Sequence, residues 1–450
     1  MKHISGKVPM NQLSAHSFNT VVADYLGKQL PNAMASALSF RSMPSDVQDF
    51  ITRMLILMQK AHFPVTDFTP SLIWQLGNII PGFLPCAWRG MVPPLTLSKR
   101  HAKIDAYVSK HIFPDRLTSP VFVDIGCGFP PITTMESAAT LSEWRVFGVD
   151  QSFSDYLLHD REGNYACFNE QGEFEYFQPR FSRVGVRMYQ NSAEVQSRFK
   201  KIFDELQLLL SSKTGQANET IDKDGYKLIH HPIRNYEAPN LSFVESKLED
   251  VQTPPAHIIR CMNTLLYFKP ETQQHMLVKL GSQLADGGML IVGSNLMNGA
   301  SCRYTVYKRE GAFVVPIEFA LTVDNLGPFN VMPWYTLHDN DPEAMQLADM
   351  IHQLRANQSF WPGFTKRLDH LMEHYGLFQR DGEGFFHAPE DEHLAADFSE
   401  RVSHMWRQIE EEGLTNEAVD ALQCAGYTAW KNPVGDIAIQ PNAPSFKLPE

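Results

Sequence analysis

Glycines and a carboxylate stand at the ends of two apolar segments, at a spacing that suits a nucleoside ligand. Residues 121–125 read as a buried strand and end in the turn Gly126-Cys127-Gly128. Asp150 closes a second apolar segment, 22 residues beyond Gly128. Glycines let a backbone approach a ligand closely, and a carboxylate can accept hydrogen bonds from ribose hydroxyls. This pattern predicts a βαβ unit that binds a nucleoside-containing cofactor.

The turn itself separates two classes of cofactor. A dinucleotide needs a third glycine where its pyrophosphate meets a helix N-terminus. Pro131 stands at that position, and proline offers no N–H and adds bulk. S-adenosylmethionine has no phosphate, and its amino acid end suits a nearby carboxylate such as Asp124. The turn therefore favours S-adenosylmethionine over the nicotinamide dinucleotide of an oxidoreductase.

The glycine turn and the second acid resemble known motifs. Residues 124–128 resemble motif I of the class I S-adenosylmethionine-dependent methyltransferases, and residues 146–150 resemble their acidic second-strand motif. The resemblance implies an α/β fold with a Rossmann-like, doubly wound sheet of seven strands, and S-adenosyl-L-methionine as the cofactor. The cofactor-binding residues that it implies are Asp124, Gly126, Cys127, Gly128, Asp150, Gln151, Leu248, Glu249, Asp250 and Asn263.

Two later segments fall where this family would place them. Residues 241–250 read as a short strand and an acidic turn, which in the family lies along the adenine. Residues 261–268, followed by a helix and Gly-Gly, are similar to a segment of chemotaxis receptor methyltransferases, which esterify glutamates. That family has an arginine where this chain has Met262. The resemblance supports the fold and the cofactor and leaves glutamate methylation open.

The chemistry implied by this resemblance is an in-line displacement at a sulfonium carbon, in which an enzyme mainly supplies positioning and desolvation. An amine or hydroxyl acceptor also needs a group that takes its proton. Tyr267, Tyr304 and Glu318 are the catalytic candidates, and no spacing rule selects among them. Asn295 and the pair Trp334-Tyr335 are candidates for lining an acceptor pocket. No metal site is predicted, because the histidines and acids lack the spacing of metal ligands.

Element patterns divide the chain into five parts. They are a mostly helical N-terminal region, 1–117; a Rossmann-like core, 118–299, with an insertion at about 155–240; a second insertion or substrate cap, 300–410; the closing helix and strands of the core, 411–440; and a loose tail, 441–450. The first part is interpreted either as a cap over the active site or as a packing platform or dimer surface. These alternatives, and the oligomeric state, stay open.

Composition indicates which kinds of partner the protein could bind and in which compartment it is expected. The chain has 450 residues, of which 43% are hydrophobic, so a large core is expected. Its net charge of −12 argues against a nucleic-acid substrate, since phosphate contacts need a basic surface. No apolar run is long enough to cross a bilayer, and no signal peptide is recognised. The six cysteines show no paired spacing and read as free thiols, which predicts a cytoplasmic protein.

Together these patterns predict a methyltransferase that transfers the methyl group of S-adenosylmethionine to an N, O or S atom of a small molecule. The large insertions suit an enclosed pocket. The first alternative is a protein methyltransferase with a carboxyl or amine acceptor, for which a basic peptide would match the acidic charge. The second is a binding protein that keeps the fold without transferring methyl groups.

Overall fold

The structure is a computed structural model, and it describes much of the chain from Thr96 onward. The described residues are 96–111, 119–178, 192–211, 220–265, 268, 270–295, 299–327, 342–377, 379–380, 382, 386–387 and 397–449. The chain divides into two units, Pro81–Asp324 with Glu390–Glu450 and Met1–Ile80 with Asn325–Pro389. Apart from residues 96–111, the predicted helical region 1–117 lies outside the described residues, as do Trp334 and Tyr335.

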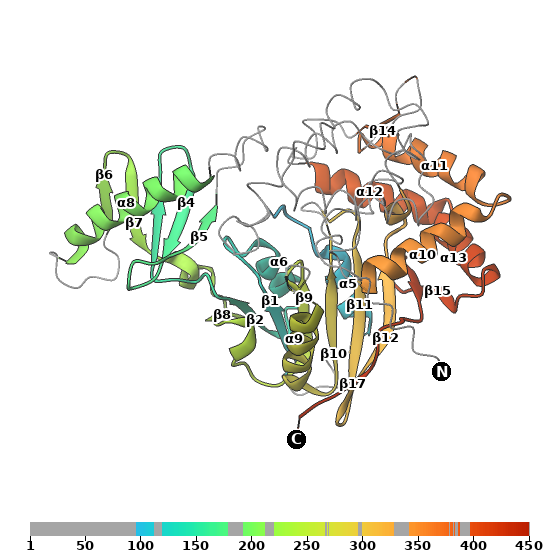
Figure 1. Cartoon of the computed structure of the whole chain (residues 1–450), viewed down its shortest axis with the longest axis horizontal. Coiled ribbons are helices and arrows are strands. Elements are labelled where there is room, and N and C mark those ends of the chain that lie inside the picture. The colour runs from blue at the N-terminus through green and yellow to red at the C-terminus, as the bar shows by residue number, and fades with distance from the viewer. Residues whose placement is uncertain are drawn as a thin grey trace, which may run out of the picture. The chain divides into compact units, whose positions relative to one another are not determined.

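The larger unit is built on one sheet whose first half is parallel (Figure 1). Its parallel strands are β8 (Leu241–Glu245), β2 (Arg145–Asp150), β1 (Val121–Ile125), β9 (Ala256–Met262) and β10 (Leu284–Ser294), adjacent in that order. This is the 3-2-1-4-5 order of a doubly wound Rossmann sheet. All five residues of β1 are buried, as expected of a central parallel strand covered on both faces.

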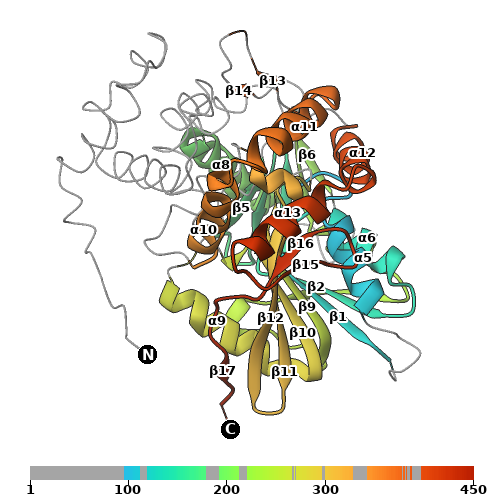
Figure 2. The same ribbon diagram turned by 90° about the vertical axis from the view of Figure 1, so that its right-hand side faces the viewer.

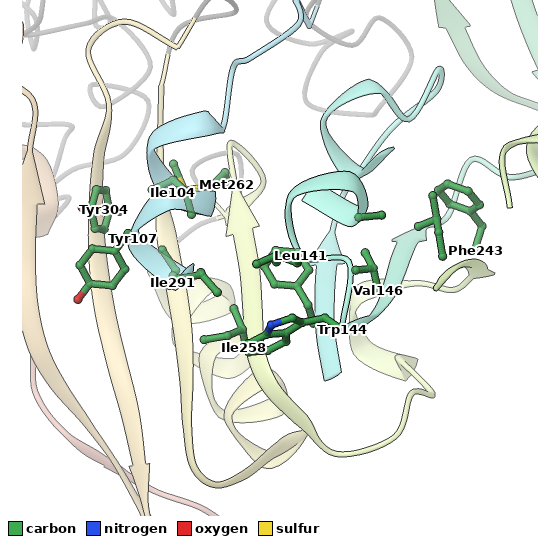
Figure 3. Packing of buried hydrophobic residues seen from close by; sticks show 14 of the residues in the cluster. Ile104, Tyr107, Leu141, Trp144, Val146, Phe243, Ile258, Met262, Ile291 and Tyr304 are labelled. Carbon is green, nitrogen blue, oxygen red and sulfur yellow. The ribbon is translucent and has the colours of Figure 1, made fainter. Parts of the chain in front are cut away.

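Alternation along the strands sends side chains to two separate cores. Phe122, Ile258 and Ile291 enter the core shared with helices α5 (Ala102–His111) and α6 (Ile132–Thr140). Figure 3 shows Ile258 and Ile291 of the strands and Ile104 of α5 among the side chains of this core. The next residues of the same strands, including Val123, enter the opposite core with α9 (Pro270–Ser282). The predicted α/β, Rossmann-like, doubly wound fold is therefore present.

The second half of the sheet is antiparallel and differs from the expectation. Strands β11 (Arg303–Glu310), β12 (Phe313–Leu321), β16 (Ile437–Ile439) and β15 (Ala429–Lys431) continue from β10 in that order, and β17 (Phe446–Lys447) pairs with β12. The sheet thus has ten strands instead of the predicted seven. Residues 303–321 belong to the sheet and not to an insertion. Their alternation predicts strands, but alternation alone does not say which neighbour they pair with.

The segment between β2 and β8 forms a smaller antiparallel sheet with its own helix. Its strands are β3 (Tyr156–His159), β4 (Tyr165–Phe168), β5 (Phe174–Gln178), β6 (Ile221–Lys223) and β7 (Tyr226–His230), in the order β5-β4-β3-β7-β6, and its helix is α8 (Ser192–Ser211). Phe168 and Phe203 stack with ring centroids 4.0 Å apart, inside a separate aromatic core. The insertion predicted at about 155–240 is therefore a folded layer with its own hydrophobic interior.

The remaining described helices belong to different units. Helices α10 (Pro342–Ala356) and α11 (Trp361–His374) and the short pair β13 (Gln379–Arg380) and β14 (Phe386–His387) lie in the smaller unit. Helices α12 (Phe398–Glu411) and α13 (Leu414–Cys424) lie in the larger unit, where α13 packs on β15 and β16 (Figure 2). The predicted block 300–410 is therefore divided among the main sheet, the smaller unit and α12.

Candidate functional site

The glycine turn after β1 and the acid that ends β2 are hydrogen-bonded to each other. Gly126 N–H donates to the Val149 carbonyl at 2.8 Å, and Gly128 N–H donates to Asp150 Oδ2 at 2.9 Å. Both glycines have left-handed backbones, with φ of 71° and 68°, a conformation that costs L-residues energy. Glycine at both positions therefore lets the carboxyl ends of two adjacent strands form one continuous turn.

A Gly126→Ala substitution is expected to lower the free energy of unfolding by about 2–4 kcal/mol, from backbone strain and steric overlap together. The added Cβ would collide with Thr264 Oγ1. Gly128→Ala is the matched control, since Gly128 has the same left-handed backbone but no heavy atom within 4 Å of a built Cβ. It should cost only the strain, about 1–2 kcal/mol. Urea denaturation of both variants measures the difference.

Removing the obstacle tests the steric part of this prediction. Adding Thr264→Ala to Gly126→Ala should return the variant to about the stability of Gly128→Ala, because the hydroxyl that collides is gone. If Gly126→Ala and Gly128→Ala were equally destabilised from the start, the contact between Thr264 and the glycine turn would not constrain this site.

Asp124 is committed to an internal ion pair. Its Oδ1 accepts from Arg260 Nε at 2.9 Å, and its Oδ2 accepts from Arg260 Nη2 and Thr134 Oγ1, each at 2.6 Å. The residue is 3% exposed. Asp124 was predicted to suit the amino acid end of the cofactor, but both of its oxygens are engaged within the protein. The geometry gives it the role of anchoring β1 to β9 and α6.

Arg260 serves two carboxylates at once. Its Nη1 donates to Asp105 Oδ1 at 2.7 Å, and Ser137 Oγ donates to the same carboxylate. Asp124 holds the guanidinium at two nitrogens, which leaves Asp105 with a single ionic contact. Burial therefore raises the pKa of Asp105 to about 6, although Arg260 and the Ser137 hydrogen bond oppose the rise.

Asp105→Asn is expected to remove a pH-dependent loss of stability. The folded-state pKa of Asp105 is about 6, and its ordinary pKa is 3.8. Protonation of Asp105 therefore stabilises the fold fully below about pH 3.8, and this stabilisation is lost as the pH rises through about 6. Relative to the variant, the wild type should lose on the order of 2–3 kcal/mol between about pH 4 and pH 7. Urea denaturation across this range measures it, with the exposed Asp155→Asn as the control. A pH-independent difference between wild type and Asp105→Asn would contradict the assignment.

The acid predicted to bind the ribose and the turn predicted to lie along the adenine are at the ends of β2 and β8, which are parallel neighbours. Asp150 Oδ1 accepts from the backbone and side chain of Ser152 at 2.9 and 2.6 Å, and the acid is partly exposed. Gln151 is exposed. The 3-10 turn η6 (Leu248–Asp250) follows β8; Leu248 packs partly buried on the α9-side core, and Glu249 and Asp250 are exposed. These positions are accessible at the carboxyl edge of the sheet, where doubly wound folds bind ligands.

Asn263 follows β9 and pairs with Asn295, which follows β10. Asn263 Nδ2 donates to Asn295 Oδ1 at 2.8 Å, and Asn295 N–H donates to Asn263 Oδ1 at 3.1 Å. Asn263 has φ of 59°, a left-handed conformation that asparagine tolerates better than most residues.

Cys127, in the neighbouring glycine turn, has its pKa raised well above its usual value by burial and by Asp150 and Asp124, so it is a neutral thiol.

Two of the catalytic candidates are enclosed in a hydrogen-bond network. Tyr304 donates to Asp436 Oδ2 at 3.0 Å, and Asn432 Nδ2 donates to Tyr304 Oη and to Glu318 Oε1, each at 2.9 Å. Burial raises the pKa of Tyr304 well above its usual value and also raises that of Glu318. These contacts favour a packing role for both side chains. Tyr267, the third candidate, lies outside the described residues.

Sequence patterns missed the charged and polar residues that support the turn. Arg260 lies in β9 (Ala256–Met262), where every other residue except His257 is apolar, and its charge was the available signal. Arg100 and His101 carried no signal, although both are buried against Asn295.

Within the described ranges, no group of histidines, cysteines and acids forms a metal site, and no helix there has the length and hydropathy to span a membrane.

Comparisons with known proteins give partial structural matches. No protein-family model matches the chain, and no curated protein matches it significantly. The N-methyltransferase NodS of Bradyrhizobium japonicum WM9, solved with S-adenosyl-L-homocysteine, is 11% identical, and the match covers 43% of this chain and 59% of that one at a TM-score of 0.19. Magnesium protoporphyrin IX methyltransferase of Synechocystis PCC 6803 is 12% identical over 48% of this chain and 57% of that one, at a TM-score of 0.20.

Coclaurine N-methyltransferase, solved with N-methylheliamine and S-adenosyl-L-homocysteine, is 12% identical, with 96% and 100% of the two chains covered and a TM-score of 0.24. The chain spans less than two thirds of the first two structures. The assignment of the fold therefore depends on strand order and on the glycine turn. By those features, the core has a Rossmann-like, doubly wound arrangement.

Proposed function

We propose that this protein is an S-adenosylmethionine-dependent methyltransferase that acts on a small-molecule acceptor. The observation that carries the proposal is the hydrogen bond between Gly128 N–H and Asp150, which joins a glycine turn to an acid at the carboxyl edge of a parallel sheet. Beside Gly128, no heavy atom of the described residues other than its own chain neighbours lies within 4 Å of the place of a Cβ. A ligand can therefore approach the turn backbone closely there.

The accessible residues fit a nucleoside sulfonium and not a dinucleotide. Asp150 is partly exposed, and its three internal hydrogen bonds leave about one of its roughly four lone-pair sites for a ribose hydroxyl. Gln151 and the η6 turn would surround the adenine, and Asn263 with the backbone of the glycine turn would face the amino acid end. Pro130 and Pro131, which directly precede α6, have no N–H groups of their own to donate to a pyrophosphate.

The cofactor supplies an electrophilic methyl group. The task of the chain is to hold donor and acceptor in line and to exclude water. The described residues assign no proton acceptor, because Tyr304 and Glu318 are committed to their buried network. The proposal therefore rests on positioning by the glycine turn, Asp150 and Asn263.

Calorimetric titration with S-adenosylmethionine, S-adenosylhomocysteine and NAD tests the cofactor. The expected result is saturable binding of the two sulfur nucleosides and no binding of NAD. Binding of NAD alone would overturn the proposal. Methyl transfer from labelled cofactor into a size-fractionated extract then tests the acceptor. Label in the small-molecule fraction supports a small acceptor, whereas label only in protein would favour a protein methyltransferase.

A further inference from the structure

Three buried residues and one partly buried residue join three separate segments at the carboxyl edge of the sheet. Arg100 and His101 precede α5, Asn263 follows β9, and Asn295 follows β10. We call these four residues the amide cluster. Arg100, His101 and Asn295 are each less than a tenth exposed. Buried polar networks of this kind stabilise one specific arrangement when every member is satisfied.

Asn295 is the centre of the amide cluster. Its Oδ1 accepts from Arg100 Nε at 3.0 Å and from Asn263 Nδ2 at 2.8 Å. Its Nδ2 donates to the Arg100 carbonyl at 2.8 Å and lies 3.3 Å from His101 Nδ1. Arg100 Nη2 donates to the Asn295 carbonyl at 3.0 Å. Burial and the Arg260 and Arg100 cations hold the pKa of His101 well below its usual value, so the imidazole is neutral and can accept from the amide.

Asn295 also holds Asn263, whose backbone is left-handed. Asn263 has φ of 59°, a conformation that asparagine adopts more readily than most residues with a Cβ. The backbone N–H of Asn263 donates to the Gly293 carbonyl at 2.8 Å, and its side-chain amide makes the reciprocal pair with Asn295. Loss of the Asn295 side chain would remove one of these bonds and free the turn to relax.

The turn that Asn263 begins packs on the cofactor turn. Thr264 is the next residue, and its hydroxyl occupies the space that a Cβ on Gly126 would need. A shift of Asn263 would therefore also move Thr264, which packs against Gly126 of the glycine turn. The segment before α5 is fixed at its other side as well, because Lys99 N–H donates to Glu136 Oε2 of α6 at 2.8 Å. The amide cluster thus connects this segment to the glycine turn through direct contacts.

We propose that Asn295 is a positioning residue for the cofactor: it sets the Asn263–Thr264 turn against Gly126 and joins that turn to the segment Thr96–His101. The inference rests on the proposed function, since it deepens the account of the same site. Asn295 acts through Asn263, so the two residues make one contribution to cofactor affinity and not two independent ones.

The test is a double-mutant cycle in the affinity for S-adenosylhomocysteine, measured by calorimetry on the full chain. Asn295→Ala and Asn263→Ala should each weaken binding about tenfold relative to the wild type. The double variant should weaken binding by at most about twentyfold, because the effects of substitutions within one network do not add. Asn295→Asp keeps the acceptor oxygen for Arg100 and Asn263 but places a second oxygen where the amide donates to the Arg100 carbonyl at 2.8 Å, so it should weaken binding about as much as Asn295→Ala does.

The control variant is Asn432→Ala, which breaks the separate buried network of Tyr304 and Glu318. It should lower the melting temperature without changing cofactor affinity, a pattern that separates positioning from general stability. If Asn295→Ala does not fold, Arg100→Lys serves instead, because lysine cannot make both guanidinium bonds to Asn295, and it should also weaken binding.

Unchanged affinity in folded Asn295→Ala, or losses that multiply in the double variant, would overturn the inference while the wild type still binds S-adenosylhomocysteine. A wild type that binds neither S-adenosylmethionine nor S-adenosylhomocysteine would instead overturn the proposed function, and the inference with it. The two failures are therefore distinguishable in one set of titrations.

Discussion

Arg260→Met is expected to lower the free energy of unfolding by about 3–5 kcal/mol, because it leaves two buried carboxylates without their shared cation. Arg260 is fully buried, and it donates to both Asp124 and Asp105. Methionine has a similar reach and is apolar, so the lost charge dominates over lost volume. Since domains are stable by only about 5–15 kcal/mol, the variant should unfold at much lower urea concentrations. Tryptophan fluorescence during urea denaturation measures the change.

The cause of this loss can be separated from packing. Adding Asp124→Asn and Asp105→Asn to Arg260→Met removes both unpaired charges while keeping the shapes of the side chains. This triple variant should recover more than half of the lost stability, as expected where a buried ionic cluster is replaced by neutral groups. If the triple variant were no more stable than Arg260→Met alone, the guanidinium would contribute through packing and not through charge.

The second large effect is expected at Asp150. Asp150→Ala should weaken S-adenosylhomocysteine binding at least about 100-fold, since hydrogen bonds to a charged group contribute about 1.5–3 kcal/mol each. The carboxylate also accepts from Gly128 N–H at 2.9 Å, so its loss removes both the proposed ribose contact and a support of the turn. Calorimetric titration measures the affinity.

Two variants show which of these contributions matters. Asp150→Asn retains one oxygen for the Gly128 N–H, and it should bind more tightly than Asp150→Ala but less tightly than the wild type. Asp155→Ala removes an exposed acid from the loop between β2 and β3, and this variant should bind S-adenosylhomocysteine as tightly as the wild type does. Wild-type affinity in a folded Asp150→Ala variant would remove this residue from the proposed site.

The parallel core could be predicted because its signals are local. Residues 121–125 form a buried strand, and the glycines that follow adopt the left-handed backbone that the turn requires. The helix predicted after residue 268 is present as α9, although β10 already begins at Leu284, before the Gly-Gly pair. Apolar periodicity and glycine spacing are properties of short segments, so they are visible without knowledge of any partner.

Pairings between distant residues could not be predicted. The alternation of residues 303–319 indicates strands, but their place beside β10 depends on which sheet edge was free. The reciprocal pair of Asn263 and Asn295 joins residues 32 positions apart, across the ends of two strands. Tyr304 and Glu318 were chosen as chemical groups, and the fold places both against Asn432 instead.

The sequence by itself therefore determined the class of fold, the glycine turn and the acid at the end of the second strand. Each of these depends on residue types within one strand–turn–helix segment. Only the tertiary structure decided that Asp124 is bound by Arg260, 136 positions away, and that Asn295 supports Asn263. The physical reason is that strand register and helix packing select the partner of a buried polar group, and no local pattern encodes that choice.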